Sequence, residues 1–248
     1  MDQPREPIFN VPFVVVAVIV VLALVHGARE YLLSDAADRE LVWALAFVPA
    51  RYETTVITDG ILPGGWGADV WTFFTYALVH ADWTHLGFNA VWLLAFASPV
   101  ARRFGGLRFM VFFMVSVAGG ALVYLFAHAG EVAPMVGASA GVSGMMGAAA
   151  RFAFEPGGSL DMWRGDRENA DRVPAAPLLV ALRNPRVITF VAVWFGLNLL
   201  FGLGSIPIGG TAGQEVAWEA HVGGFLAGLL LFSFFDPEGR RPDPMEPA

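Results

Sequence analysis

Residues 136–146 read VGASAGVSGMM, a run of small side chains that contains two serines, Ser139 and Ser143. From Gly137 to Ala150, 11 of 14 residues are Gly, Ala or Ser. Because side chains this small let helix backbones approach closely, the run predicts a helix packed tightly against its neighbours. Hydroxyl groups at membrane depth are costly and usually functional. The two serines are therefore candidates for chemistry.

The chain around this run is too apolar for a soluble protein of its length. Its 248 residues are 56% hydrophobic and 15% charged, and a bilayer core about 30 Å thick needs about 20 apolar residues per helix. The sequence therefore predicts an all-α polytopic membrane protein, with a single domain over residues 1–248 and a short polar tail at 236–248. The six predicted spans are 8–27, 83–101, 107–128, 135–154, 186–203 and 217–235.

The arginines indicate how the six spans are oriented, because positively charged loops favour the cytoplasmic side. All 15 basic residues are Arg. With the N-terminus in the cytoplasm, only Arg29, Arg39 and Arg51 lie outside. The other twelve lie inside: Arg5, Arg102, Arg103, Arg108, Arg151, Arg164, Arg167, Arg172, Arg183, Arg186, Arg240 and Arg241. Both termini are therefore predicted to be cytoplasmic, and the net charge of −7 argues against a nucleic-acid partner.

Two further groups of polar residues lie in or beside predicted spans. His80 comes just before the second span, and His85 and Asn89 share one helix face because they are four positions apart. His221 precedes Gly224 by three positions in the sixth span, so a partner backbone can come near its imidazole. The natural partner is the helix that carries the two serines.

Together these groups contain the parts that a serine hydrolase needs. A serine becomes nucleophilic when a base removes its proton, and histidine is the side chain best suited to do so at neutral pH. The tetrahedral intermediate then needs hydrogen-bond donors for its oxyanion, and His85, Asn89 and a backbone N–H at a helix start are suited to that role.

These motifs resemble those of the rhomboid intramembrane serine proteases. HxxxN at 85–89, GxS at 137–139 and AHVGG at 220–224 occur in the family's order within residues 71–235. The resemblance implies a six-helix core with a Ser/His dyad in a water-filled cavity, without a metal or another cofactor. It also implies an integral protein of the bacterial inner membrane whose site opens to the non-cytoplasmic side. Its partners would be membrane lipid and the transmembrane segments of substrate proteins.

The family spacing separates the two serines. Relatives usually read GASGxxxGxxG, with the last glycine eight positions after the nucleophile. Counted from Ser139, that position is Gly147, whereas counted from Ser143 it is Arg151. Ser139 also follows Pro134 at a helix start, where free N–H groups and the positive end of the helix dipole can stabilise an oxyanion. Ser139 is therefore the expected nucleophile.

The resemblance also assigns the remaining roles. The expected site consists of the catalytic Ser139 and His221, the oxyanion donors His85, Asn89 and Ser139, the supporting residues Gly137, Ala138, Ser143 and His80, and the packing glycines Gly147, Gly224 and Gly228. The chain departs from the family at Ala140, where relatives commonly have glycine, and at Ser143, where they often have an aromatic ring that stacks on the histidine. Substrate access is expected beside the 186–203 span, under the 204–216 connection.

Other interpretations stay open at this point. A rhomboid-like protein without activity would bind transmembrane helices for quality control or sorting, and it would be expected to lack the serine or the histidine. A metalloprotease could use His80, His85 and His221, but HExxH is absent. A channel or transporter fits less well, since the polar residues converge on one pocket. Asn198 is interpreted as a residue that holds helices together, and no carboxylate is assigned to orient His221.

Overall fold

The computed structural model describes residues 11–53, 62–161, 170–202 and 216–240, and every named element in them is a helix. Parts of the first and fifth predicted spans and most of the 204–216 connection lie outside these residues. The elements are α1 (Phe13–Leu32), α2 (Asp35–Leu45), η1 (Pro49–Tyr52), α3 (Gly65–Thr75), η2 (Tyr76–Leu78), α4 (Trp83–Trp92), η3 (Leu93–Ala97), α5 (Ser98–Phe104), α6 (Gly106–Ala127), α7 (Ser139–Ala149), α8 (Leu178–Ala181), α9 (Pro185–Gly202), α10 (Trp218–Phe235) and η4 (Glu238–Arg240).

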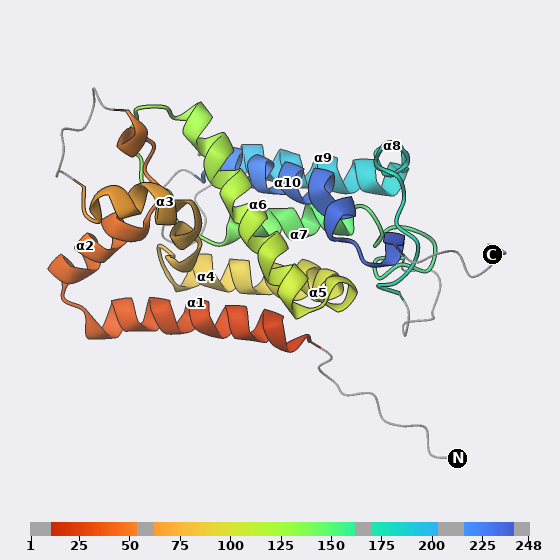
Figure 1. Ribbon diagram of the computed structural model, residues 1–248, viewed down its shortest axis with the longest axis horizontal. Helices are drawn as coiled ribbons and strands as arrows, with labels where there is room; N and C mark the ends of the chain where they lie inside the picture. Colours follow the sequence, from red (N-terminus) through yellow and green to blue (C-terminus); the bar gives the residue numbers. More distant parts are fainter. Residues whose placement is uncertain (1–10, 54–61, 162–169, 203–215, 241–248) are drawn as a thin grey trace, which may run out of the picture.

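Three of these helices, α1, α6 and α10, are long and apolar enough to cross a membrane, and α9 has a shorter apolar stretch, Pro185–Leu200. Large apolar side chains point away from the protein on these helices, for example Phe13, Phe126 and Phe234 at 86%, 77% and 70% exposure. In Figure 1, α1 lies along one side of the molecule, and α6 crosses α7 and α10 obliquely.

The second predicted span contains a π-helical turn. The chain runs from Trp83 to Phe104 through α4, the π-helical η3 and α5. Pro99, in the first turn of α5, has no N–H to donate to the carbonyl four residues earlier. The hydrogen-bond ladder must therefore rearrange just before it, and η3 lies there.

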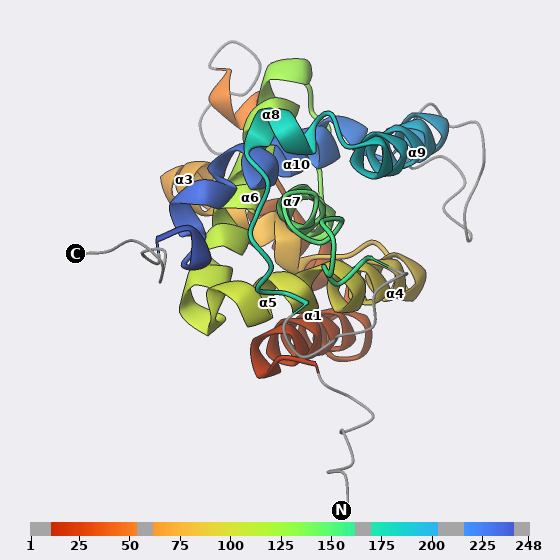
Figure 2. The ribbon, with the colours of Figure 1, turned by 90° about the vertical axis from the view of Figure 1, so that its right-hand side faces the viewer.

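The α7 helix is shorter than the predicted span at 135–154. It begins at Ser139 because the chain before it is extended, with Met135 and Phe47 exchanging backbone hydrogen bonds of 2.8 and 3.0 Å. All of its residues from Ala140 to Ala149 are buried. In the end-on view α7 lies at the centre of the bundle (Figure 2). A helix enclosed by other helices does not need the length that contact with lipid on every side would require.

Close contact between α7 and α10 depends on glycine. A Cβ atom added at Gly224 would lie 2.0 Å from the Ala140 carbonyl oxygen, and one at Gly228 would lie 2.0 Å from that of Gly144. A Cβ at Gly147 would lie 2.3 Å from the Phe225 carbonyl oxygen. These distances are too short for any side chain, so the two backbones touch directly. We call this contact the glycine seam.

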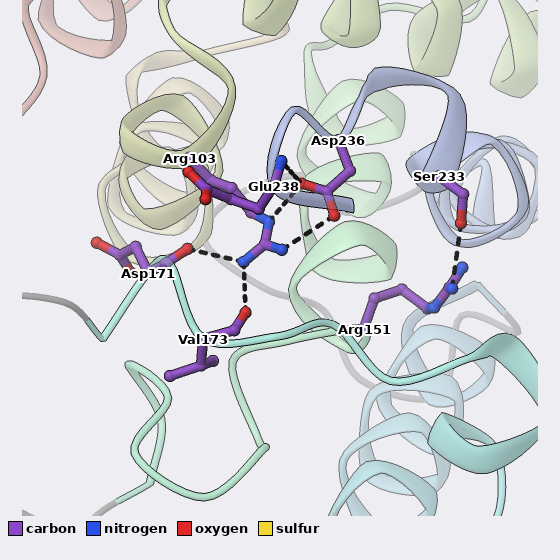
Figure 3. A network of polar contacts seen from close by, with 7 residues as sticks. All are labelled: Arg103, Arg151, Asp171, Val173, Ser233, Asp236 and Glu238. Carbon is purple, nitrogen blue, oxygen red and sulfur yellow. Dashed lines mark hydrogen bonds and ion pairs between the residues drawn. The ribbon is translucent and has the colours of Figure 1, made fainter. Parts of the chain in front are cut away.

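A buried ion pair joins the end of α5 to the end of α10 (Figure 3). Arg103 donates to both carboxylate oxygens of Asp236 at 2.8 and 2.9 Å, and to the carbonyl oxygens of Asp171 and Val173 at 2.9 and 2.8 Å. Its guanidinium lies 4.7 Å from the centre of the Phe152 ring. The predicted polar tail therefore begins with a residue that belongs to the bundle.

A second arginine, Arg151, forms hydrogen bonds in the same region. Arg151, just after α7, donates to the carbonyl oxygens of Ala176 and Leu229 at 3.0 and 3.1 Å, and to the Ser233 hydroxyl at 3.2 Å (Figure 3). It thus links the end of α7 to the last turns of α10. Together, Arg103, Arg151, Asp236 and the groups they bind form what we call the arginine end.

Candidate active site

Ser139 is held by the backbone that leads into α7. Gly137 has a φ of +117°, a conformation that residues with a side chain rarely adopt. Its N–H donates to the Tyr76 carbonyl at 2.9 Å, and the buried Tyr76 hydroxyl donates to the Val117 carbonyl at 2.7 Å. A Cβ at Gly137 would lie 2.7 Å from the His85 ring. Only glycine therefore fits between His85 and Ser139.

His221 faces Ser139 across the glycine seam. It lies in the first turn of α10, and its Nε2 atom is 2.7 Å from the Ser139 hydroxyl oxygen. Ser143 lies one turn deeper in α7 and is 3% exposed. Both ring nitrogens of His221 have partners, and Ser143 is not one of them. The geometry thus pairs the histidine with the first of the two serines.

The other ring nitrogen of His221 binds a residue whose role the sequence did not reveal. His221 Nδ1 is hydrogen-bonded to Oδ1 of Asn198, on α9. Asn198 Nδ2 donates in turn to the Trp194 carbonyl at 2.7 Å, one turn earlier in the same helix. The one sequence signal is a carboxamide within an apolar span, which is expensive there and usually functional. Nothing in the sequence links it to a histidine 23 positions away.

His80 lies beside the start of α7. It is 0% exposed, and its Nε2 accepts the Ala138 N–H at 3.4 Å, while its carbonyl accepts from Arg29 at 2.7 Å. Burial lowers the pKa of His80 to about 3. The imidazole is therefore neutral at physiological pH, as an acceptor must be.

His85 and Asn89 occupy one face of α4, as predicted from their spacing. Asp82 caps this helix, and its carboxylate accepts the His85 N–H at 2.8 Å. The His85 ring lies near that of His80, with centroids 5.1 Å apart, and against Gly137. The Asn89 amide donates to the His85 carbonyl at 3.0 Å and is 4% exposed. One of its two N–H groups is thus engaged with its own helix.

Glu219, the acidic residue nearest to His221 in the described sequence, binds elsewhere. It lies 3.4 Å from Nε2 of His128, whose Nδ1 is 2.8 Å from Glu131. Glu215 lies outside the described residues. No group of three His, Cys, Asp or Glu side chains within the described ranges is arranged to hold a metal ion. The arrangement contains what acyl transfer to a serine requires: a hydroxyl, a base and a group that orients the base.

The helix predicted to border substrate access, α9, stands at the edge of the bundle (Figure 2). Its Trp194 ring stacks on Phe225 of α10 at 4.7 Å between centroids, and its Phe190 ring lies 5.5 Å from Phe96. Phe195 is 38% exposed. Ring contacts therefore hold α9 against its neighbours near the site.

Comparison with known proteins gives one family and two relatives. A family model described as the Rhomboid domain matches residues 67–236. Human Rhomboid-related protein 3 is 35% identical over 81 residues, which are 33% of this chain and 20% of that protein. Rhomboid protease GlpG of Enterobacter sp. (strain 638) is 26% identical over 163 residues, which are 66% of this chain and 48% of that protein. The matches thus span less than half of either relative.

Proposed function

The chain belongs to the rhomboid family, and from that premise we propose that it is an intramembrane serine endopeptidase with Ser139 as nucleophile and His221 as general base. Its family and its apolar helices make it an integral membrane protein. The observation that carries the proposal is the 2.7 Å contact between the Ser139 hydroxyl and His221 Nε2. The protease named among its relatives supports the same activity.

In the proposed reaction the Ser139 oxygen bonds to the scissile carbonyl carbon as its proton moves to His221 Nε2. The carbonyl electron pair moves onto oxygen and forms the oxyanion. Collapse of this intermediate breaks the C–N bond, and the Nε2 proton passes to the leaving amine. Water then attacks the acyl ester, giving one proton to Nε2. That proton returns to Ser139 as the new carboxyl group departs.

The proposed oxyanion donors surround the start of α7. The first intrahelical bond there runs from Val142 N–H to the Ala138 carbonyl at 3.0 Å, so earlier N–H groups precede the ladder. The Ala138 N–H already donates to His80, which favours Ser139 N–H as the backbone donor. The His85 ring, packed on Gly137, is the proposed side-chain donor.

Asn89 is proposed as a further donor, because an amide nitrogen carries two N–H groups. One is committed to the His85 carbonyl, so the other would have to reach the oxyanion. Loss of one such donor costs about 10²- to 10³-fold in kcat in other enzymes.

The membrane arrangement is part of the proposal. Six spans, in one membrane domain, would correspond to α1, the α4–η3–α5 run, α6, α7, α9 and α10, with both termini in the cytoplasm of a bacterial cell and the domain in its inner membrane. The arginine end would face the cytoplasm, as positively charged segments prefer, and Ser139 would open to the other side. Substrate spans would reach Ser139 beside α9. They would unwind locally to expose a peptide bond, so Gly or Pro in them should help.

The test uses a fluorophosphonate probe and a panel of single-span substrates with detergent-purified protein. Wild type and Ser143→Ala should be labelled and should cleave a substrate. Ser139→Ala should lose labelling, and both Ser139→Ala and His221→Ala should lose at least about 10³-fold in cleavage, because removal of nucleophile or base disables the whole unit. Ser143→Ala is the matched control, since it removes a hydroxyl one turn away.

Two results would overturn the proposal. If Ser139→Ala kept cleavage while Ser143→Ala lost it, the nucleophile would be wrong. If folded wild type showed neither labelling nor cleavage, the inactive helix-binding alternative would be favoured instead.

A further inference from the structure

We infer that Asn198 is a positioning residue that holds His221 in the one tautomer and ring orientation able to take a proton from Ser139. The inference rests on the proposed function and adds a third member to its Ser/His pair. It derives from the contact between His221 Nδ1 and Asn198 Oδ1.

The hydrogen bonds of Asn198 fix the orientation of its amide. An amide has one end that donates and one that accepts. Nδ2 lies 2.7 Å from the Trp194 carbonyl, which can only accept. The donating end therefore faces Trp194, and the atom that faces His221 must be the acceptor Oδ1.

The orientation of this amide determines the tautomer of the His221 imidazole. In neutral histidine one ring nitrogen carries a proton and the other a lone pair. Because Oδ1 can only accept, Nδ1 must carry the proton. The lone pair is then on Nε2, which faces the Ser139 hydroxyl at 2.7 Å. The carbonyl of Trp194 thus sets, through Asn198, which atom of His221 is the base.

Packing between α9 and α10 holds Asn198 beside His221. It is buried, at 8% exposure, and Trp194, one turn earlier on α9, stacks on Phe225 of α10. Phe225 lies four residues after His221 in the same helix. Ring packing therefore fixes α9 to α10 one turn from the amide–imidazole contact.

The other titratable groups around His221 supply no negative charge to its ring. From α4, the His85 ring packs against Gly137, two residues before Ser139, and as a histidine it brings no negative charge to the site. From its own helix, Glu219 lies by His128. Within the described part of the chain, no carboxylate is bonded to Nδ1, so the orienting group is uncharged. Such a group fixes geometry without adding a negative charge that would stabilise the imidazolium.

The experiment compares Asn198→Leu, which removes the acceptor at similar volume, with Asn198→Asp, which keeps an acceptor but adds charge. Asn198→Leu should lower kcat about 5-fold with KM nearly unchanged, since a lost hydrogen bond of about 1 kcal/mol corresponds to roughly that factor. Asn198→Asp should recover part of this loss. It should also move the acid limb of the kcat/KM profile to higher pH, because a carboxylate stabilises the protonated ring. Leu197→Ala, on the exposed neighbour in α9, should match wild type.

A second readout follows the tautomer directly. ¹⁵N NMR of the five histidines in the inactive Ser139→Ala background, with His221 assigned by His221→Gln, should show a protonated Nδ1. Asn198→Leu should show a mixture of tautomers. This signal does not depend on activity. If the leucine variant fails to fold, Asn198→Asp still tests the contact, because its carboxylate should shift the ¹⁵N titration of His221 to higher pH, and an unchanged titration would contradict the inference.

The outcomes separate the inference from the proposed function. Wild-type kcat, pH profile and tautomer in Asn198→Leu, with Ser139→Ala inactive, would overturn the role of Asn198 alone. Cleavage by Ser139→Ala would overturn the proposed function, whatever Asn198→Leu did.

Discussion

The two ends of the α7–α10 pair are built from different chemistry. At the arginine end, the Arg103 side chain is 0% exposed and its partner Asp236 is 5% exposed, and Arg103 bonds to two further carbonyls. At the other end, which we call the serine end, Ser139, His221 and Asn198 form a chain of single hydrogen bonds between groups that need carry no charge.

The difference shows how one pair of helices can be fixed and reactive at once. A buried charge keeps its place because leaving its partner costs several kcal/mol. A neutral hydroxyl–imidazole contact costs little to rearrange, and a proton can move along it. The glycine seam runs between the two ends and holds α7 and α10 in direct backbone contact.

The largest expected effect comes from breaking the arginine end. Arg103→Ala leaves the Asp236 carboxylate buried without its partner, so the free energy of unfolding should fall by about 3–5 kcal/mol. Thermal or denaturant unfolding in detergent measures this. Probe labelling of the fraction that stays folded should change only a few-fold.

Arg186→Ala is the control, because the Arg186 side chain is 51% exposed to solvent. Its partner Asp161 is 4% exposed but also accepts the Gly157 N–H at 2.9 Å, so the carboxylate keeps a donor when the arginine is removed. Removing the Arg186 side chain should lower the free energy of unfolding by about 0–1 kcal/mol. Equal decreases in the free energy of unfolding of Arg103→Ala and Arg186→Ala would contradict the view that burial strengthens the Arg103–Asp236 ion pair.

The next effect in size comes from widening the glycine seam. Gly224→Ala adds a Cβ that would lie 2.0 Å from the Ala140 carbonyl oxygen, so α10 must shift and carry His221 away from Ser139. A misplacement of about 1 Å can cost about 10²-fold in rate, so probe labelling should slow by about that factor.

Gly196→Ala tests whether the slower labelling comes from the contact with Ala140 or from any Gly→Ala change within a helix. Gly196 is a helical glycine on α9 with nothing within 4 Å of an added Cβ, so its replacement should leave labelling unchanged. Labelling of Gly224→Ala at the wild-type rate would show that this backbone contact does not position His221.

A smaller effect is expected from acid at the serine end. The pKa of His80 is lowered to about 3 by burial, whereas in the unfolded chain it is about 6.5. Below pH 6.5 the unfolded state therefore binds a proton that the folded state does not. The neutral His80 side chain makes its full contribution to the free energy of unfolding above pH 6.5, and this contribution falls as the pH drops toward 3. At pH 5 the loss is about 2 kcal/mol.

His80→Gln should remove this part of the acid sensitivity. Unfolding measured at pH 7 and pH 5 should show a smaller decrease in the variant than in wild type. An identical decrease in both proteins would mean that His80 already takes up its proton in the folded state.

Much of the serine end could be anticipated from the sequence because its determinants are local. The start of α7 at Ser139 follows from Pro134 and Gly137 just before it, and the face shared by His221 and Gly224 follows from helix periodicity. The all-helical character of the described residues follows from composition. The number of spans and the orientation in the membrane stay predictions.

What could not be anticipated depends on pairs distant in the chain. The sequence indicated only that Asn198 holds helices together. Its partner His221 lies 23 positions away, and no local pattern connects the two residues. Arg103 was counted only as a cytoplasmic charge, because its partner Asp236 is 133 positions away. The length of α7 was overestimated because hydropathy does not distinguish a helix surrounded by lipid from one surrounded by protein.

The π-helical turn η3 has a consequence for how this chain tolerates changes in length. It lies between His85, near the first turn of α4, and Arg103, at the end of α5. A π-helical turn accommodates one residue more than an α-helical turn. Deleting one residue within η3 would restore regular α-helical winding and leave α5 close to its present orientation, because the π-helical turn holds the extra residue. Deleting one residue elsewhere between His85 and Arg103 would instead rotate α5 by about 100° relative to α4 and turn Arg103 away from Asp236. The chain should therefore tolerate a one-residue deletion at η3 better than anywhere else in this helical run.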